Sequence, residues 1–145
     1  EMVEPMVREH APDAPLTLLD GRSHEALAAC DVTLIASGTA TLEAALFKRP
    51  MVIAYQLSPM SWLIMKRMGY LPWVGLPNIL LQDRAVPELL QEQATPEAMA
   101  AGVLSWLDQP AQVQQLNQRF TDLHELLLRD TPTLSAHAIE SLLAR

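Results

Sequence analysis

The residues best suited to chemistry lie in the segment Ser37-Gly38-Thr39-Ala40-Thr41-Leu42-Glu43, which follows an apolar run and opens a predicted helix. A helix N-terminus offers unpaired N–H groups and a positive dipole end, which suits a phosphate. Gly38 lets a ligand approach the backbone closely, and the Glu43 carboxylate can accept hydrogen bonds from two ribose hydroxyls. The simpler alternative is that Ser37 or Thr39 caps the helix and Glu43 is a first-turn acid. The residues alone leave both interpretations open.

The sequence lacks the residue patterns that several other kinds of chemistry require. The segment has no Gly-Lys-Ser/Thr of a P-loop and no G-x-G-x-x-G pattern, so a kinase, a GTPase or a typical dehydrogenase is unsupported. It has no G-x-S-x-G elbow, which argues against a hydrolase. The four histidines lack the spacing of a zinc helix. The single cysteine, Cys30, is expected to be a small buried hydrophobe rather than a nucleophile.

The charge is uneven along the chain. The formal net charge is −7, which makes nucleic acid a poor partner. The stretch from Lys48 to Arg84, however, holds five basic residues and one acid. Such a basic island indicates a local anionic partner, either a phosphate or an anionic membrane surface. An ordinary solvated face is the alternative.

The segment Met60–Trp73 also has two interpretations. Apolar residues at helical spacing usually pack in a core. Here Trp62 and Trp73 lie near Lys66 and Arg67, and apolar anchors beside basic residues are also typical of a membrane-interface patch. The sequence does not decide whether the two tryptophans face the core or the membrane.

The positions of these residues depend on alternating strands and helices. Apolar runs predict strands at 16–19, 32–36 and 51–55, separated by helices at 24–30 and 39–47. Ser23 and Thr95 are expected N-caps. Further helices are predicted at 1–10, 60–68, 86–91, 96–107, 110–128 and 131–145, with a short apolar run ending near Gln82. Strands alternating with helices predict an α/β fold with a Rossmann-like parallel sheet and covering helices.

Size and composition are those of a folded domain. The chain has 145 residues, 50% of them hydrophobic and 19% charged, which argues against intrinsic disorder. No apolar stretch reaches the ~18 residues of a membrane span. Together with the absence of a leader pattern and of cysteine pairs, this predicts a cytoplasmic protein.

The order of motifs identifies a family resemblance. Leu18-Leu19-Asp20-Gly21, the Ser37–Glu43 segment, Lys48-x-Pro50-Met51-Val52, Val74-x-Leu76-Pro77-Asn78 and Glu88-Leu89-Leu90-Gln91 follow one another. This order closely resembles the C-terminal part of bacterial lipid-A-disaccharide synthase, over nearly the whole chain. The Ser37–Glu43 loop also looks like the donor-binding loop of other glycosyltransferases with two Rossmann-like halves, such as the peptidoglycan N-acetylglucosaminyltransferase.

The resemblance implies a membrane-associated inverting glycosyltransferase of the GT-B architecture. Such an enzyme transfers 2,3-diacylglucosamine from its UDP donor to 2,3-diacylglucosamine 1-phosphate and releases UDP. The product is the β-1,6-linked disaccharide of lipid A. The family implies no metal and no cofactor, and it implies peripheral contact with lipid on the cytoplasmic face of the inner membrane.

The resemblance also assigns roles to residues. It implies that Glu43 holds the donor ribose, that Tyr55 lines the cleft and that Asn78 is a catalytic residue. The loop expected to face the diphosphate comprises Ser37, Gly38, Thr39 and Ala40.

The domain prediction has two parts. Residues 1–109 are expected to form a partial C-terminal Rossmann-like domain that binds the nucleotide sugar. Residues 110–145 are expected to be helices that pack on this domain or cross to an N-terminal half that the chain lacks. The acceptor site and the general base would lie in that half, so the chain alone is expected to be inactive. An exposed apolar face of these helices predicts self-association into a homo-oligomer.

Two alternatives remain beside this interpretation. Another UDP-sugar glycosyltransferase, or a UDP-sugar epimerase, would share the nucleotide site and differ in its dependence on lipid. A non-catalytic interaction module would have no nucleotide site and would bind no UDP.

Overall fold

The computed structural model describes residues 3–36, 38–68 and 72–143, and the chain divides into two compact units, residues 1–30 and 31–145. The first unit contains helices α1 (Val3–His10) and α2 (Ser23–Ala29). The strand predicted at 16–19 is wrong, since no strand forms there and its three leucines are exposed. A strand needs a neighbouring strand to complete its hydrogen bonds. The described residues of this unit contain no strand with which 16–19 could pair.

Helix α2 begins one residue earlier than expected. Arg22, not Ser23, occupies the N-cap position, and no side-chain hydrogen bond caps the helix there. The guanidinium of Arg22 forms an exposed ion pair with Glu25. The hydrogen bond from Arg22 lowers the pKa of the Glu25 carboxyl below its ordinary value.

The second unit is built on a parallel sheet. Its strands are β1 (Thr33–Ile35), β2 (Met51–Tyr55) and β3 (Glu88–Leu90), in the order β1-β2-β3. Ile35 pairs with Ile53, and Ile53 pairs with Glu88. The predicted α/β class with a parallel sheet is therefore confirmed, and the carboxyl ends of all three strands lie at one edge.

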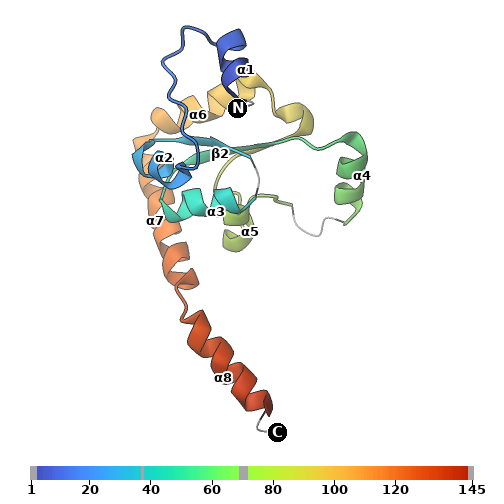
Figure 1. The fold of residues 1–145 in the computed structure, drawn as a ribbon, viewed down its shortest axis with the longest axis vertical. Helices are drawn as coiled ribbons and strands as arrows, with labels where there is room; N and C mark the ends of the chain where they lie inside the picture. The colour runs from blue at the N-terminus through green and yellow to red at the C-terminus, as the bar shows by residue number, and fades with distance from the viewer. Residues whose placement is uncertain (1–2, 37, 69–71, 144–145) are drawn as a thin grey trace. The chain divides into compact units, whose positions relative to one another are not determined.

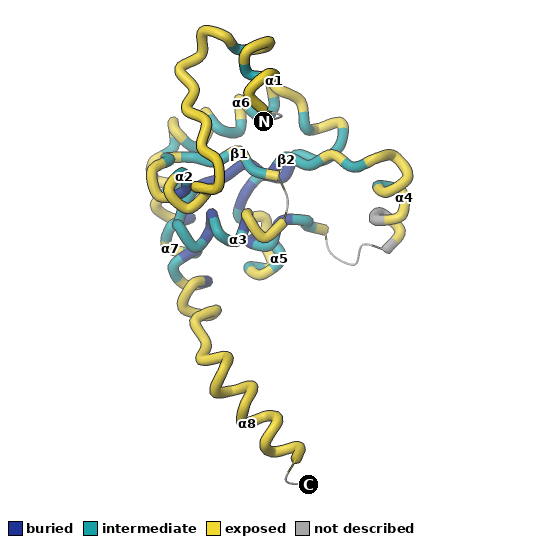
Figure 2. The backbone as a smooth tube through the Cα atoms, viewed as in Figure 1, coloured by how far each residue is buried: buried dark blue, intermediate teal, exposed yellow. Residues whose placement is uncertain are grey.

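Helices cover both faces of the sheet. Helix α3 (Thr39–Leu46) contacts β1 and β2 on one face, and α6 (Pro96–Leu107) contacts the same strands on the other (Figure 1). Gly102 permits the close approach of α6, because a Cβ there would lie 2.9 Å from Val52 Cγ2. Met51, Val52 and Ile53 of β2 are completely buried between the helices, in the dark blue core of Figure 2.

The C-terminal helices differ in burial. Helix α7 (Pro110–Leu127) contacts α3 and α6 and buries Leu116, Phe120 and Leu123, which share one face at helical spacing. Helix α8 (Thr131–Leu143) has no buried residue and is exposed along its length (Figure 2). The proposed boundary at residue 110 stays a prediction.

Between β2 and β3 the chain leaves the sheet and returns. We call residues 57–75 the excursion; they include α4 (Pro59–Met68), and α5 (Leu76–Leu81) follows directly. The short helix predicted at 86–91 is wrong, because Glu88–Leu90 is strand β3 and a 3₁₀ turn, η1 (Gln91–Gln93), follows it. Glu-Leu-Leu-Gln has good helix propensity, but pairing with β2 overrides it.

Thr95 gives a local test of helix stability. Its hydroxyl accepts a hydrogen bond from the N–H of Ala98 at 3.2 Å, so the predicted cap of α6 is confirmed. We expect Thr95→Ala to lower the free energy of unfolding by about 1 kcal/mol, measured by urea denaturation. Thr95→Ser keeps the acceptor and is expected to remain within a few tenths of a kcal/mol of the parent. Equal losses in both variants would contradict a role for the cap.

Candidate functional site

The N-terminus of α3 lies at the carboxyl edge of the sheet, directly after β1. Gly38 is the N-cap, so this position has no side chain with which to bind the first-turn N–H groups. Its φ of 128° lies in a region that residues with a Cβ rarely adopt. Gly38, Thr39 and Ala40 are exposed. Ser37 lies outside the described residues.

Thr41 fixes the conformation of this turn from inside. It is completely buried, and its hydroxyl donates to the carbonyl oxygen of Gly38 at 2.7 Å, while its N–H donates to the same oxygen at 3.1 Å. The carbonyl of Gly38 is thus held toward the helix. The N–H groups of Thr39 and Ala40 precede the first intrahelical hydrogen bond and lie at the positive end of the helix dipole.

Glu43 lies within α3, and Tyr55 ends β2. Glu43 is half-buried one turn into α3, beyond the first turn, so the alternative that it is a first-turn acid is wrong. Tyr55 is the half-buried last residue of β2 and pairs with Leu90. The structure therefore brings Gly38, Thr39 and Ala40 to the strand edge at which Tyr55 also lies. Their binding roles stay predictions.

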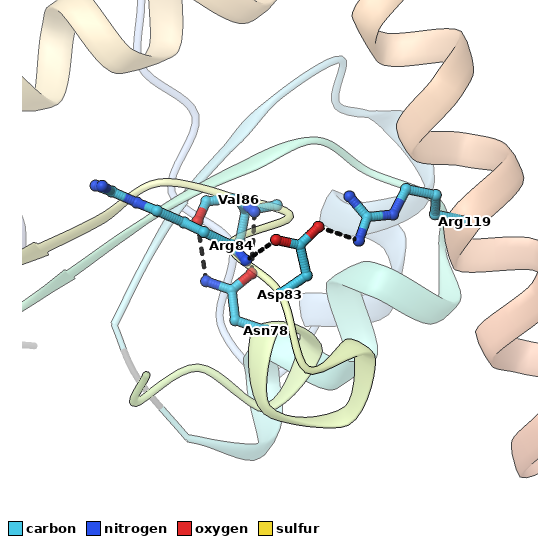
Figure 3. A network of polar contacts seen from close by, with 5 residues as sticks. All are labelled: Asn78, Asp83, Arg84, Val86 and Arg119. Atoms are coloured by element: carbon cyan, nitrogen blue, oxygen red, sulfur yellow. Dashed lines mark hydrogen bonds and ion pairs between the residues drawn. The ribbon is translucent and has the colours of Figure 1, made fainter. Parts of the chain in front are cut away.

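Asn78 lies in a different setting. Its side chain is completely buried on α5 and makes a paired contact with one backbone residue, Val86. Oδ1 accepts from the Val86 N–H at 3.0 Å, and Nδ2 donates to the Val86 carbonyl at 2.9 Å (Figure 3). Nδ2 also donates to Glu88 Oε1 at 2.8 Å. Its predicted catalytic role stays a prediction, but every polar atom of its amide is bound within the chain.

A second polar contact lies beside this pair. Asp83 accepts from the N–H of Arg84 at 2.7 Å and from the guanidinium of Arg119 at 2.8 Å (Figure 3). Both side chains of the Arg119–Asp83 ion pair are exposed by more than a third. Solvent weakens such a pair, so we expect it to contribute little to the stability of the fold.

Glu88 is a buried acid whose role the motif Glu88-Leu89-Leu90-Gln91 did not reveal. It is 6% exposed on β3, and its carboxylate accepts three hydrogen bonds. The N–H of Val74 donates to Oε2 at 3.0 Å, and the N–H of Gly75 donates to Oε1 at 2.9 Å, beside the bond from Asn78. The carboxylate thereby holds the end of the excursion and the N-cap of α5 against β3.

Gln91 holds the other end of the excursion. Its Oε1 accepts from the Leu57 N–H at 2.7 Å, and its Nε2 donates to the Leu57 carbonyl at 3.2 Å. This repeats the pairing that Asn78 makes with Val86. Glu88 on β3 therefore binds the end of the excursion, and Gln91, directly after β3, binds its beginning. A polar residue directly after a short apolar run was the available signal for Gln91, and an acid inside such a run was the signal for Glu88.

Helix α4 presents an unusual surface. Met60, Leu63 and Ile64 are more than half exposed, and Arg67 is exposed at the next helical position on the same side. Trp62 and Trp73 are half-buried, so the structure gives neither a fully core nor a fully exposed position. In the part of the chain that is described, no helix is long and apolar enough to cross a membrane. The same residues contain no cluster of three metal-ligating side chains.

Comparisons with known proteins agree on one family. The sequence profile described as "Lipid-A-disaccharide synthetase" matches residues 1–139. A lipid-A-disaccharide synthase of Albidiferax ferrireducens is 59% identical over 145 residues, covering 97% of this chain and 37% of the relative. Those of Verminephrobacter eiseniae and Pseudomonas syringae pv. syringae are 56% and 54% identical, each over 34% of the relative. The chain thus spans about a third of the length of the curated relatives it matches.

Proposed function

This chain belongs to the lipid-A-disaccharide synthetase family, and we propose that it forms the donor-binding part of a GT-B glycosyltransferase that makes the lipid A disaccharide. The donor is UDP-2,3-diacylglucosamine, the acceptor is 2,3-diacylglucosamine 1-phosphate, and UDP is released. The relatives named above are lipid-A-disaccharide synthases more than twice as long as this chain. The acceptor site and the general base are assigned to the part of such a protein that lies outside these residues.

The N-terminus of α3 is the observation that carries the proposal. It is exposed, its N-cap is a glycine with φ of 128°, and it follows β1 at the carboxyl edge of a parallel sheet. Ligands of open parallel sheets bind at this edge, and a diphosphate suits a helix N-terminus. We assign to Glu43, one turn later, the hydrogen bonds to the ribose hydroxyls of UDP, as the family resemblance implies.

The proposed reaction is a single displacement at C1 of the donor sugar. The 6-hydroxyl oxygen of the acceptor forms the new bond to C1 while the bond from C1 to the UDP oxygen breaks. The electron pair of that bond leaves with UDP, and the hydroxyl proton passes to the base. The start of α3 stabilises the charge that builds on the leaving diphosphate, because its dipole is fixed before the reaction begins.

An assay of UDP release tests the proposal. A full-length protein, with this chain in place of the matching segment of a relative, is expected to release UDP only when both lipid substrates are present. The 145-residue chain alone is expected to release none. Disaccharide formation by the chain alone would contradict the assignment of the acceptor site and the general base to residues outside this chain. A full-length protein that binds UDP but ignores both lipid substrates would favour another UDP-sugar enzyme.

The proposal includes lipid contact by α4. Met60, Leu63 and Ile64 form an exposed apolar stripe with Arg67 at its end, and apolar residues beside a cation suit an anionic membrane interface. Both substrates carry acyl chains and require such a surface. We place the full-length protein on the cytoplasmic face of the inner membrane, where this stripe meets lipid.

Replacing Leu63 by serine is expected to weaken binding to vesicles of phosphatidylethanolamine and phosphatidylglycerol about fivefold, which corresponds to about 1 kcal/mol. The cause is the loss of an apolar side chain that is 52% exposed in the free chain. Sedimentation with vesicles measures the bound fraction. Leu104→Ser is the matched control, because Leu104 is a similarly exposed leucine on α6. Equal losses in the two variants would place the lipid contact elsewhere.

A further inference from the structure

Every polar side-chain atom of Asn78 and Glu88 has a hydrogen-bond partner within the chain. Asn78 is completely buried and Glu88 is 6% exposed. The two amide atoms of Asn78 bind both backbone groups of Val86, and Nδ2 also binds Glu88. The two carboxylate oxygens of Glu88 receive that bond and the N–H groups of Val74 and Gly75. A buried, fully bonded network of this kind specifies one local arrangement.

We infer that Asn78 is a positioning residue of the proposed glycosyltransferase, which acts through Glu88 on the backbone at Val74 and Gly75 and does not touch substrate. The inference rests on the proposed function and deepens it. The family resemblance implies that Asn78, in the segment Leu76-Pro77-Asn78, is a catalytic residue, whereas the inference gives it a positioning role. A catalytic amide must reach the reacting atoms. Here the atoms that would reach them are already bound within the chain.

The contact that the pair controls is close to the donor-binding helix. Gly75 is the N-cap of α5, and α5 packs on α3, the helix that carries Glu43. The approach of Gly75 to the sheet is tight, since a Cβ at this position would lie 2.3 Å from Ile53 Cδ1. The carboxylate of Glu88 therefore sets the distance between the start of α5 and β3. Asn78 holds that carboxylate and, through Val86, the residues that lead into β3.

The first experiment measures amide hydrogen exchange in the 145-residue chain. Asn78 makes no bond to Gly75, yet Asn78→Ala is expected to speed exchange of the Gly75 amide about tenfold, because Glu88 loses the group that orients it. The matched control is Asn117→Ala, since Asn117 lies on α7 and its Oδ1 has no hydrogen-bond partner among the described residues. Unchanged exchange at Gly75 in a folded Asn78→Ala chain would overturn the inference.

The second experiment is a double-mutant cycle in the full-length protein. Asn78→Ala and Glu88→Gln are each expected to lower kcat, and the double variant is expected to stay within about threefold of the worse single variant, because both changes break one unit. The Kd for UDP is expected to change much less than kcat. Losses that multiply would show that the two residues act independently, and that result would overturn the inference.

A third variant covers the case in which Asn78→Ala does not fold. Asn78→Asp places a second carboxylate beside Glu88, so the pair is expected to hold a proton and the melting temperature of this chain to rise as the pH falls from 8 to 6. Adding Glu88→Gln should remove that dependence and restore part of the activity. A pH dependence that persists in the double variant would contradict direct coupling.

These outcomes separate the inference from the proposed function. The full-length protein could make no disaccharide while Gly75 exchange and the pH profile behaved as expected. The Asn78–Glu88 contact would then be supported, and the proposed reaction would be wrong. The assignment of a role in that reaction would then fall with it. If the protein made the disaccharide and the losses multiplied, the proposed function would stand and the positioning role would fail.

Discussion

Replacing Phe120 by alanine is expected to lower the free energy of unfolding by about 3–5 kcal/mol. Phe120 has no exposed surface and lies between Leu116 and Leu123 on the face of α7 that meets α3 and α6. Removing the ring leaves a cavity that the surrounding helices fill only in part. Urea denaturation of the 145-residue chain, followed by circular dichroism, measures the change.

Leu126→Ala supplies the comparison for this experiment. Leu126 lies on the same helix but is 57% exposed, so its loss is expected to change the free energy of unfolding by no more than about 0.5 kcal/mol. The contrast tests whether α7 belongs to the folded domain. A loss under about 1 kcal/mol for Phe120→Ala would mean that α7 does not dock on α3 in solution.

The second large effect concerns the nucleotide. We expect UDP to shift the amide signals of residues 38–40 and Glu43→Ala to weaken UDP binding about 10- to 100-fold. The lost hydrogen bonds involve a charged group, and such bonds contribute about 1.5–3 kcal/mol. NMR titration of the chain measures both the affinity and the location of the shifts.

Glu97→Ala is the control for the nucleotide experiment, because Glu97 is an exposed acid in the first turn of α6. Its replacement should leave UDP binding unchanged. Equal affinity of the parent and the Glu43→Ala chain would contradict the ribose contact. If a well-folded parent chain bound no UDP, the same titration on the full-length protein would show whether residues outside the chain supply most of the affinity.

The elements that the sequence predicted well are those with local signals. The strand at 51–55 and the helix at 96–107 have the predicted bounds. Met51–Tyr55 is an apolar, β-branched run after a proline, and α6 has Thr95 as its cap and Pro96 in its first turn. Such signals depend on neighbouring residues and need no knowledge of the partner.

The errors arose where a distant partner decides the structure. Glu88–Leu90 has the composition of a helix and becomes a strand only because β2 offers its edge. The run at 16–19 has the composition of a strand and finds none to pair with in its unit. The same limit applies to the site. The start of α3 was predictable from Gly38 and its flanking elements, whereas the burial of Asn78 depends on Val86 and Glu88 eight and ten residues away.

Because both ends of the excursion are bound to β3 or to the residue after it, the residues between those ends can change without altering the sheet. Leu57 is fixed by Gln91, and Val74 and Gly75 are fixed by Glu88, so the register of β2 and β3 does not depend on what lies between. Doubling the length of a flexible loop costs only about 0.6 kcal/mol. The intervening stretch can therefore change in length and sequence while the sheet keeps its structure. Under the proposed lipid contact of α4, we expect a graft of this stretch from a relative to change lipid preference without disturbing the sheet.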